Sequence, residues 1–210
     1  MKTILCFGDS LTWGFNPENF ERYPYQLRWT IQLQSMLGEG HRVIEEGFNG
    51  RTTVIENPYK AHCSGIAALP MLLESHSPID LVIIMLGSND LQLHCAVSAP
   101  QAAAGCVTCI NKIQMSMAGP KGTAPKTLLM APPPMKQPAK GMELFFTGAK
   151  KESENIAQHY KTVANMMGVD FFDAGAVVSA SELDGIHLDE PAQAILAAHL
   201  AEKIRPTLSL

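Results

Sequence analysis

A serine, an aspartate and a histidine stand in the sequence where they could act together in one reaction. Ser10 comes directly after an apolar run, in the motif Gly8-Asp9-Ser10, while Asp184 and His187 stand three residues apart near the C-terminus. An imidazole can take the proton of a serine hydroxyl, and a carboxylate can hold that imidazole in the right tautomer. Taken alone, Ser10 is more typical of a helix cap or turn, and Asp184 with His187 is more typical of an ordinary loop. Together they indicate a serine nucleophile with its base.

Two further segments could stabilise the negative charge that develops during acyl transfer. Residues 47–53 contain two glycines and follow the second predicted strand, and Gly87-Ser88-Asn89-Asp90 follows the third. A glycine lets its backbone N–H approach a substrate closely, and an Asn side chain offers an NH₂ donor. Each segment alone is more typical of a turn. Their shared placement after strands favours a role in binding an oxyanion.

Continuous apolar runs alternate with helical stretches along the chain, which is typical of a parallel sheet covered by helices on both faces. Strands are predicted over residues 3–7, 42–45, 80–86, 127–130 and 169–172. The third has no polar alternation over residues 81–86, so we expect it to be central and buried on both faces. Apolar spacings of three and four predict helices over residues 25–37, 100–117, 151–167 and 191–204, with Pro206 ending the last.

Two long segments without a regular period are predicted to be loops beside the site. They cover residues 16–24 and 131–147, and each follows a strand directly or after a short turn. Ligands of open parallel sheets bind at the carboxyl ends of the strands, so these loops are expected to form walls. Trp13 and Phe15 follow Ser10 closely and could shape a small acyl pocket. Arg51 could bind a substrate carbonyl or simply pair with an acid.

Composition and charge argue against several other classes of protein. The chain has 210 residues, of which 46% are hydrophobic, and this suits one globular domain over residues 1–210 rather than disorder. Sixteen Lys and Arg residues against twenty Asp and Glu residues give a net charge of −4, without the basic field that nucleic-acid binding requires. The apolar runs fall short of the roughly 20 residues that cross a bilayer, so we expect no association with a membrane.

The cysteines and histidines predict neither a metal nor a cofactor. Five cysteines, an odd number, are typical of reduced thiols, and the apolar run after Met1 stops too early for a secretion signal, so a cytoplasmic location is expected. No second histidine stands at ligand spacing from His187. Cys106-x-x-Cys109 falls within a predicted helix, where core packing is favoured over redox chemistry. The glycine motifs that hold nucleotide phosphates are absent from the sequence.

The four segments together resemble the SGNH or GDSL family of serine esterases and lipases over nearly the whole chain. The resemblance implies that Ser10 is the nucleophile and that Asp184 and His187 complete its triad. It also implies an oxyanion hole made by the Asn89 side chain with the backbone N–H groups of Ser10 and Gly50. The implied fold is an α/β, flavodoxin-like three-layer α/β/α sandwich with a five-stranded parallel sheet, in agreement with the five predicted strands. The Gly-x-Ser-x-Gly elbow of the common α/β-hydrolases is absent around Ser10.

Longer strings resemble one branch of that family, the arylesterases and acyltransferases. They are Gly-Asp-Ser-Leu-Thr-Trp-Gly at residues 8–14, Glu-Glu-Gly at 45–47, Arg-Thr-Thr at 51–53 and the apolar run with its glycine at 80–87. Some members of the branch form compact oligomers and transfer acyl groups to alcohols in water. We therefore expect a carboxylic ester hydrolase of small acyl esters with acyltransferase activity. We also expect a homo-oligomer, in which apolar residues 144–146 are buried against a partner subunit.

Two alternatives stay open. A carbohydrate O-acetyl esterase or a thioesterase would use the same triad, because acyl length and leaving group are selected by the shape of the loops. A non-catalytic flavodoxin-like module that binds a phosphate ligand after the first strand is less favoured, since it would give His187 no purpose. For the enzymes, the expected partner is a small-molecule ester.

Overall fold

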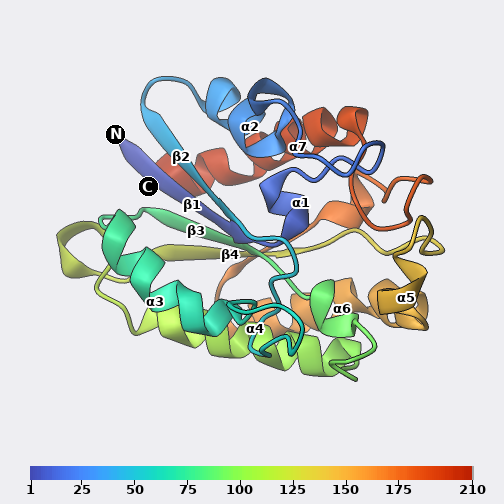
Figure 1. The fold of residues 1–210 in the computed structure, drawn as a ribbon. Coiled ribbons are helices and arrows are strands. Elements are labelled where there is room, and N and C mark those ends of the chain that lie inside the picture. Colours follow the sequence, from blue (N-terminus) through green and yellow to red (C-terminus); the bar gives the residue numbers. More distant parts are fainter. Residues whose placement is uncertain (210) are drawn as a thin grey trace.

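A five-stranded parallel sheet lies at the centre of the computed structural model, which describes residues 1–209 (Figure 1). The strands run in the spatial order β2-β1-β3-β4-β5, which is the flavodoxin-like order. They are β1 (Lys2–Gly8), β2 (His41–Gly47), β3 (Leu81–Met85), β4 (Lys126–Ala131) and β5 (Asp170–Asp173). All five predicted strands are confirmed, with ends that differ only slightly from those expected.

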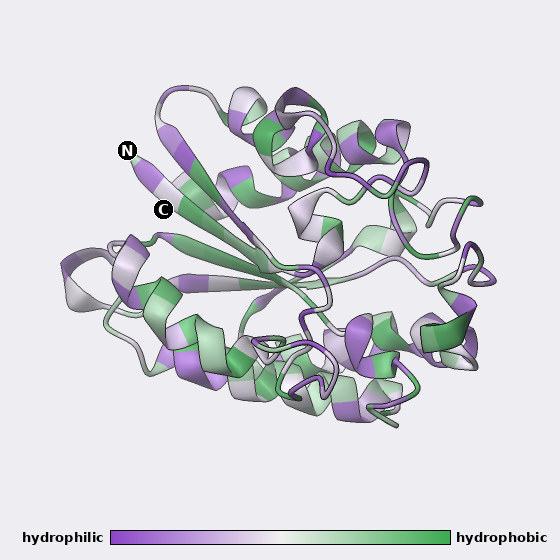
Figure 2. Cartoon of the chain, in the orientation of Figure 1, coloured by the Kyte–Doolittle hydropathy of each residue, from purple (hydrophilic) through white to green (hydrophobic). Residues whose placement is uncertain are grey.

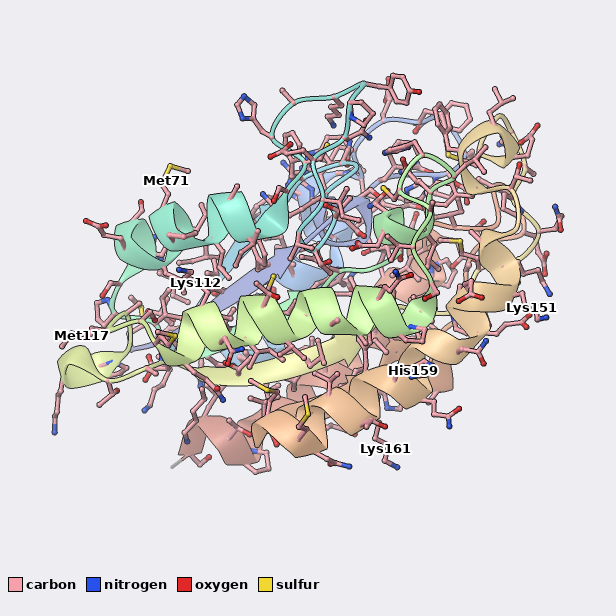
Figure 3. The ribbon with its side chains drawn as sticks, turned by 90° about the horizontal axis from the view of Figure 1, so that it is seen from below. Met71, Lys112, Met117, Lys151, His159 and Lys161 are labelled. Carbon is pink, nitrogen blue, oxygen red and sulfur yellow. The ribbon has the colours of Figure 1, made fainter. Side chains whose placement is uncertain are left out.

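Helices cover both faces of this sheet and complete a three-layer α/β/α sandwich. One face carries α3 (Gly65–His76), α4 (Ala99–Gln114) and α6 (Ala149–Met167), and Figure 3 shows α4 and α6 side by side. The opposite face carries α2 (Trp29–Leu37) and α7 (Glu190–Ser209). Side chains of a strand alternate between two cores, because β3 places Val82 and Ile84 in one and Ile83 in the other. The central strand β3 is therefore apolar along its whole length and β1 along most of its length, as Figure 2 shows in green, whereas β2 at the edge of the sheet carries polar residues.

The helices depart from the sequence prediction at several points. Residues 25–27 form a separate 3₁₀ turn, η1 (Tyr25–Leu27), and α2 begins only at Trp29 after an extended Arg28. No helix was expected between β2 and β3, yet α3 forms there with Pro70 inside it. Pro70 inside this segment and Gly65 at its first position have low helix propensity, so the local sequence pattern gives only a weak helix signal. The apolar face of α3 is buried through Leu69, Leu72 and Leu73, and this tertiary packing outweighs the weak local signal.

The prediction that Pro206 ends the last helix is wrong. α7 continues through Pro206 to Ser209, although proline cannot donate the helical hydrogen bond. The final turn is held by contacts with the sheet: Thr207 Oγ1 donates to Asp170 Oδ2 at 2.9 Å, and Lys126 Nζ donates to the Thr207 carbonyl at 2.7 Å. Leu208 is buried beneath it. These contacts stabilise the helical turn beyond the proline.

A short helix follows β1 and brings Ser10 to the carboxyl edge of the sheet. This helix, α1 (Ser10–Trp13), is capped by Asp9, whose Oδ1 accepts the Leu11 backbone N–H at 2.9 Å. It packs so closely on the end of β2 that a Cβ at Gly47 would lie 2.2 Å from the Trp13 nitrogen. The close approach explains why a glycine stands at this point of the chain.

Two buried carboxylates hold the loops at this edge. Asp90 accepts hydrogen bonds from the Thr53 backbone N–H, at 2.9 Å, and from the Thr53 hydroxyl. Asp9 is 1% exposed, and burial raises its pKa to about 7, with the Asp90 charge adding to the rise while Arg51 opposes it. Burial raises the pKa of Asp90 to about 6, although its bonds to Thr53 oppose this. Both groups therefore hold a proton more strongly in the folded chain than in the unfolded one.

No helix among residues 1–209 is long and apolar enough to cross a membrane.

Replacing Asp9 should change how stability depends on pH. The pKa of an aspartate in an unfolded chain is about 4, and the pKa of Asp9 in the folded chain is about 7. Between these values the folded state keeps a proton that the unfolded state has lost, so the free energy of unfolding falls as pH rises through this window. In Asp9→Asn this contribution is absent, and the fall between pH 4.5 and 7.5 should become shallower. Urea unfolding across that range measures it.

The exposed carboxylate of Glu202 supplies the control. Glu202→Gln also removes one acidic group, yet it should keep the slope of the unchanged protein. Equal slopes for Asp9→Asn and the unchanged protein would contradict the prediction.

Candidate active site

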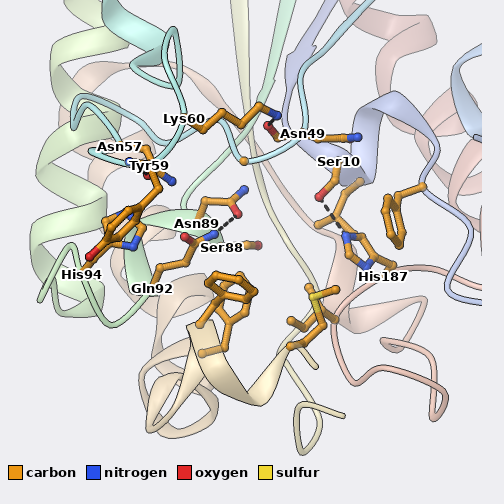
Figure 4. A pocket seen from close by; sticks show the side chains of 17 residues that line it. Ser10, Asn49, Asn57, Tyr59, Lys60, Ser88, Asn89, Gln92, His94 and His187 are labelled. Carbon is orange, nitrogen blue, oxygen red and sulfur yellow. Dashed lines mark hydrogen bonds between the residues drawn. The ribbon is translucent and has the colours of Figure 1, made fainter. Parts of the chain in front are cut away.

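The structure brings Ser10, His187 and Asp184 into one hydrogen-bonded row, and Figure 4 shows the bond between Ser10 and His187 as a dashed line. The Nε2 atom of His187 lies 2.9 Å from Ser10 Oγ, and its Nδ1 lies 2.6 Å from Asp184 Oδ2. All three side chains are buried. Ser10 opens α1 after β1, whereas Asp184 and His187 lie in the loop that leads to α7. The arrangement can move the Ser10 proton to an imidazole whose tautomer is fixed by a carboxylate.

Backbone hydrogen bonds make the loop around His187 rigid. Asp184 Oδ1 accepts the backbone N–H groups of Ile186 at 2.9 Å and His187 at 3.0 Å. The Ser181 N–H donates to the His187 carbonyl at 2.7 Å. Gly185 has a φ of +79°, a conformation that favours glycine. Asp184 thus fixes the loop with one oxygen and the imidazole with the other.

The charge of Asp184 is stabilised in spite of its burial. Burial alone would raise the pKa of this carboxyl, but hydrogen bonds from the His187 side chain, the nearby His187 charge and the backbone N–H groups of Ile186 and His187 outweigh it. The pKa of Asp184 is therefore lowered. An ionised Asp184 can stabilise the imidazolium that forms when His187 takes a proton.

Two backbone N–H groups beside the cavity are possible donors to an anion. They belong to Ser10 itself, at the first position of α1, and to Gly50, and both residues line one cavity. Neither N–H donates a hydrogen bond within residues 1–209. Gly50 has a φ of +81°, which L side chains rarely adopt, so a glycine is needed there. These groups can donate to a charge that develops beside Ser10 Oγ.

The Asn89 amide lies at this site as well, at the start of the 3₁₀ turn η2 (Asn89–Leu91), and it is 5% exposed. Its Nδ2 donates to Asp9 Oδ2 and to the Arg51 carbonyl, both at 3.1 Å. Its Oδ1 accepts from Gln92 Nε2 at 2.7 Å. Asn89 Nδ2 thus already has two acceptors. An oxyanion at this place must therefore share one N–H group of Asn89 with Asp9 or with the Arg51 carbonyl.

A cavity of about 270 Å³ opens in front of Ser10 and His187 (Figure 4). Phe15 forms one wall and stacks on the His187 ring, with centroids 4.1 Å apart. Polar side chains from the loops after β2 and β3 lie on one side, and apolar side chains lie on the other. The polar group is Asn49, Asn57, Tyr59, Lys60, Ser88, Asn89, Gln92 and His94, and the apolar group is Leu11, Met142, Phe145, Phe146 and Ile186.

Two residues expected to bind substrate, Trp13 and Arg51, lie outside the lining of this cavity. Trp13 packs beneath the Arg22 guanidinium, which lies 5.0 Å from its ring. Arg51 is 5% exposed and donates to the carbonyls of Gly8, at 2.8 Å, and Glu46. Its guanidinium therefore ties the ends of β1 and β2 together, and neither of its two expected roles, binding a substrate carbonyl or pairing with an acid, describes these contacts. Phe15, by contrast, lies where a pocket residue was expected.

The two long loops contribute unequally. Residues 131–147 form a wall as predicted, and most of its apolar surface comes from the short helix α5 (Glu143–Phe146) and Met142 before it. Residues 16–24 only support Phe15 from behind, where Phe20 lies 6.0 Å from the Phe15 ring. Lys140 joins the loops by donating to the carbonyls of Pro17, at 3.1 Å, and Glu18.

Sequence reasoning missed most of the polar wall. Residues such as Asn57, Tyr59 and Lys60 lie in an irregular segment after the glycine motif, and Gln92 and His94 lie just beyond the Asn89 motif. The one signal in the sequence that could have indicated these residues is that they lie a few positions after those motifs. Within the described part of the chain, residues 1–209, there is no group of three or more His, Cys, Asp or Glu side chains that could hold a metal ion.

The chain is similar to known proteins in both sequence and fold. Residues 6–200 match the GDSL-like lipase/acylhydrolase family. The fold superimposes on Est24, a carbohydrate acetylesterase from Sinorhizobium meliloti, with a TM-score of 0.94, 38% identity and coverage of 98% of this chain and 99% of that one. The native aryl esterase of M. smegmatis gives a TM-score of 0.94 at 39% identity, over 99% of this chain and 100% of that one.

An arylesterase from Vibrio mimicus is 36% identical over 90 residues. That match spans 41% of this chain and 37% of the relative, so this comparison covers little more than a third of the curated protein. The family match and the two structural likenesses, in contrast, extend over nearly the whole chain. The chain therefore belongs to the GDSL-like lipase/acylhydrolase family of ester hydrolases.

Proposed function

We propose that this protein hydrolyses small carboxylic esters through a Ser-His-Asp triad and an acyl-enzyme. The observation that carries the proposal is the hydrogen-bonded row of the site, with 2.9 Å between His187 Nε2 and Ser10 Oγ and 2.6 Å between His187 Nδ1 and Asp184 Oδ2. A nucleophile, a base in contact with it and a group that orients the base are the parts that acyl transfer through serine requires.

The first half of the reaction forms the acyl-enzyme. His187 Nε2 takes the hydroxyl proton as Ser10 Oγ attacks the ester carbonyl carbon. The resulting oxyanion accepts hydrogen bonds from the N–H groups of Ser10 and Gly50 and from Asn89 Nδ2. When the tetrahedral intermediate collapses, the bond from carbon to the alcohol oxygen breaks, and His187 gives its proton to the leaving alcohol. Asp184 stays ionised and stabilises the imidazolium in between.

The second half releases the acyl group. Water attacks the acyl-enzyme carbonyl while His187 again takes a proton, and Ser10 Oγ then leaves and recovers its hydrogen. An alcohol in place of water would give a new ester by the same steps. The apolar wall of Met142, Phe145 and Phe146 favours binding of such an alcohol, so we include acyl transfer to alcohols in the proposal.

Small acyl groups fit this cavity best. Its volume of about 270 Å³ lies just below the usual range of ligand pockets, which begins at about 300 Å³. Phe146 and Ile186 are buried and form part of its apolar lining. The likeness to an aryl esterase and to a carbohydrate acetylesterase supports short-chain esters as substrates.

A second candidate is the removal of acetyl groups from carbohydrates. Its support is the polar side of the cavity, where Asn57, Gln92 and His94 could hydrogen-bond to hydroxyl groups of a sugar.

We also propose a homo-oligomer that works in the cytoplasm. Large apolar side chains are exposed near the cavity, with Tyr59 81%, Leu93 62% and Leu144 74% exposed, and a partner subunit would cover them. The five cysteines are unpaired, which suits a reducing compartment. A particle with the mass of one chain in light scattering would contradict the oligomer.

Replacing Ser10 should abolish both hydrolysis and covalent labelling. A fluorophosphonate should label one residue of the unchanged protein, and Ser10→Ala should lose this label together with release of p-nitrophenol from p-nitrophenyl acetate. Ser88 also lines the cavity, so Ser88→Ala is the matched control and should keep the label. Peptide mass spectrometry identifies the labelled residue. A label that persists in Ser10→Ala would contradict the assignment.

Shortening Phe145 should widen the substrate range. Phe145 lines the cavity and is half exposed, so its truncation opens room without emptying the core. Because each methylene in an apolar pocket is worth about 1–3 kcal/mol, the ratio of kcat/KM for p-nitrophenyl hexanoate to that for the acetate should rise about tenfold in Phe145→Ala. Leu144→Ala, one position earlier in α5 and outside the cavity lining, should leave the ratio unchanged. Equal ratios in both variants would show that Phe145 does not limit the acyl group.

A further inference from the structure

Gln92 is a buried side chain at the active site that the steps above do not use. It lies directly after η2, is 8% exposed and lines the cavity. Its Nε2 donates to Asn89 Oδ1 at 2.7 Å, and Figure 4 shows this bond as a dashed line. A buried polar side chain that donates to a proposed oxyanion donor can control the orientation of that donor.

The contacts of Asn89 differ sharply at the two ends of its amide. The carbonyl end accepts from Gln92, and the NH₂ end faces two acceptors, Asp9 Oδ2 and the Arg51 carbonyl, at 3.1 Å each. Turning the amide by 180° would place its oxygen against the Arg51 carbonyl, which can only accept, and its NH₂ group against that of Gln92. Such contacts are repulsive, and the hydrogen-bond network therefore decides which end of an amide points where.

Only the NH₂ end of Asn89 can stabilise an oxyanion, since a carbonyl oxygen would repel it. A hydrogen bond donated to the amide oxygen also polarises the amide and makes its N–H groups stronger donors. Gln92 therefore acts on Asn89 in two ways, by fixing the orientation and by strengthening the donor.

We propose that Gln92 is a positioning residue of the oxyanion hole, which holds the Asn89 amide with its NH₂ group toward the developing charge. The Arg51 carbonyl is its counterpart at the opposite end of the amide. The inference rests on the proposed function, in which Asn89 donates to the oxyanion.

The rival role for Gln92 is direct contact with substrate, because its side chain lines the cavity. Contact with bound substrate would appear mainly in KM and would not require Asn89. Positioning through Asn89 acts on the transition state, so it lowers kcat with little change in KM. It also disappears when Asn89 is absent.

Two substitutions of Gln92 separate these roles. Gln92→Met keeps the length of the side chain and removes the donor, and kcat should fall about tenfold, as expected for loss of one hydrogen bond. Gln92→Glu keeps the shape and places a carboxylate against Asn89 Oδ1, which favours the turned amide. It should therefore lower kcat further than Gln92→Met, with KM unchanged in both.

The decisive measurement repeats both substitutions in Asn89→Ala, which itself should lose about 10² to 10³ in kcat. In that background neither change at Gln92 should have a further effect, because residues that act as one unit are not additive. Gln158→Met and Gln158→Glu, on the exposed surface of α6, are matched controls and should keep full activity. Equal losses in kcat with and without Asn89, or losses confined to KM, would overturn the proposal.

A measurement without turnover keeps the inference distinct from the proposed function. The side-chain ¹H–¹⁵N signals of Asn89, identified by their loss in Asn89→Ala, should shift in both Gln92 variants and stay in place in the Gln158 variants. Signals that do not move would overturn the positioning role. An unchanged protein that neither hydrolyses esters nor labels at Ser10 would overturn the proposed function alone, and the Asn89 signals would still report on Gln92.

Discussion

The parallel direction of all five strands is the constraint on which the site depends. Because the strands run the same way, the segments that follow β1, β2 and β3 all emerge at one edge of the sheet, with Ser10, Gly50 and Asn89 on them. His187 reaches the same edge from the loop before α7. The central strands are buried on both faces, so this edge is fixed by packing rather than by the loops themselves.

The three buried aspartates at the site show how surroundings decide the charge of identical groups. Asp184 receives bonds from an imidazole and two backbone N–H groups, and its pKa is lowered in spite of burial. Asp9 and Asp90 are buried as deeply, but their donors offset less of the burial, and their pKa values are raised. The carboxylate that must stay charged during the reaction is thus the one with the most complete set of donors.

The sequence predicted the features that local pattern determines. Five apolar runs predicted five strands, and short motifs after them predicted Ser10, Asn89, Asp184 and His187 as a group that the structure brings together. The predictions that were wrong concern features that depend on contacts between residues far apart in the sequence. Leu69, Leu72 and Leu73 of α3 are buried against the sheet despite Pro70, and contacts of Thr207 with β4 and β5 carry α7 past Pro206. Arg51 was expected either to bind a substrate carbonyl or to pair with an acid, because no pattern in the sequence shows that its guanidinium donates to backbone carbonyls.

The hydrogen bonds from Lys140 to the carbonyls of Pro17 and Glu18 limit how the two loops beside the cavity can change in length among related proteins. The loop that supports Phe15 and the loop that leads to α5 are not independent, because one ammonium group spans them. An insertion in either loop would pull this group away from its acceptors and disturb both sides of the cavity mouth. Changes in length are therefore expected to occur in the two loops together, whereas single substitutions within α5 can alter the cavity alone.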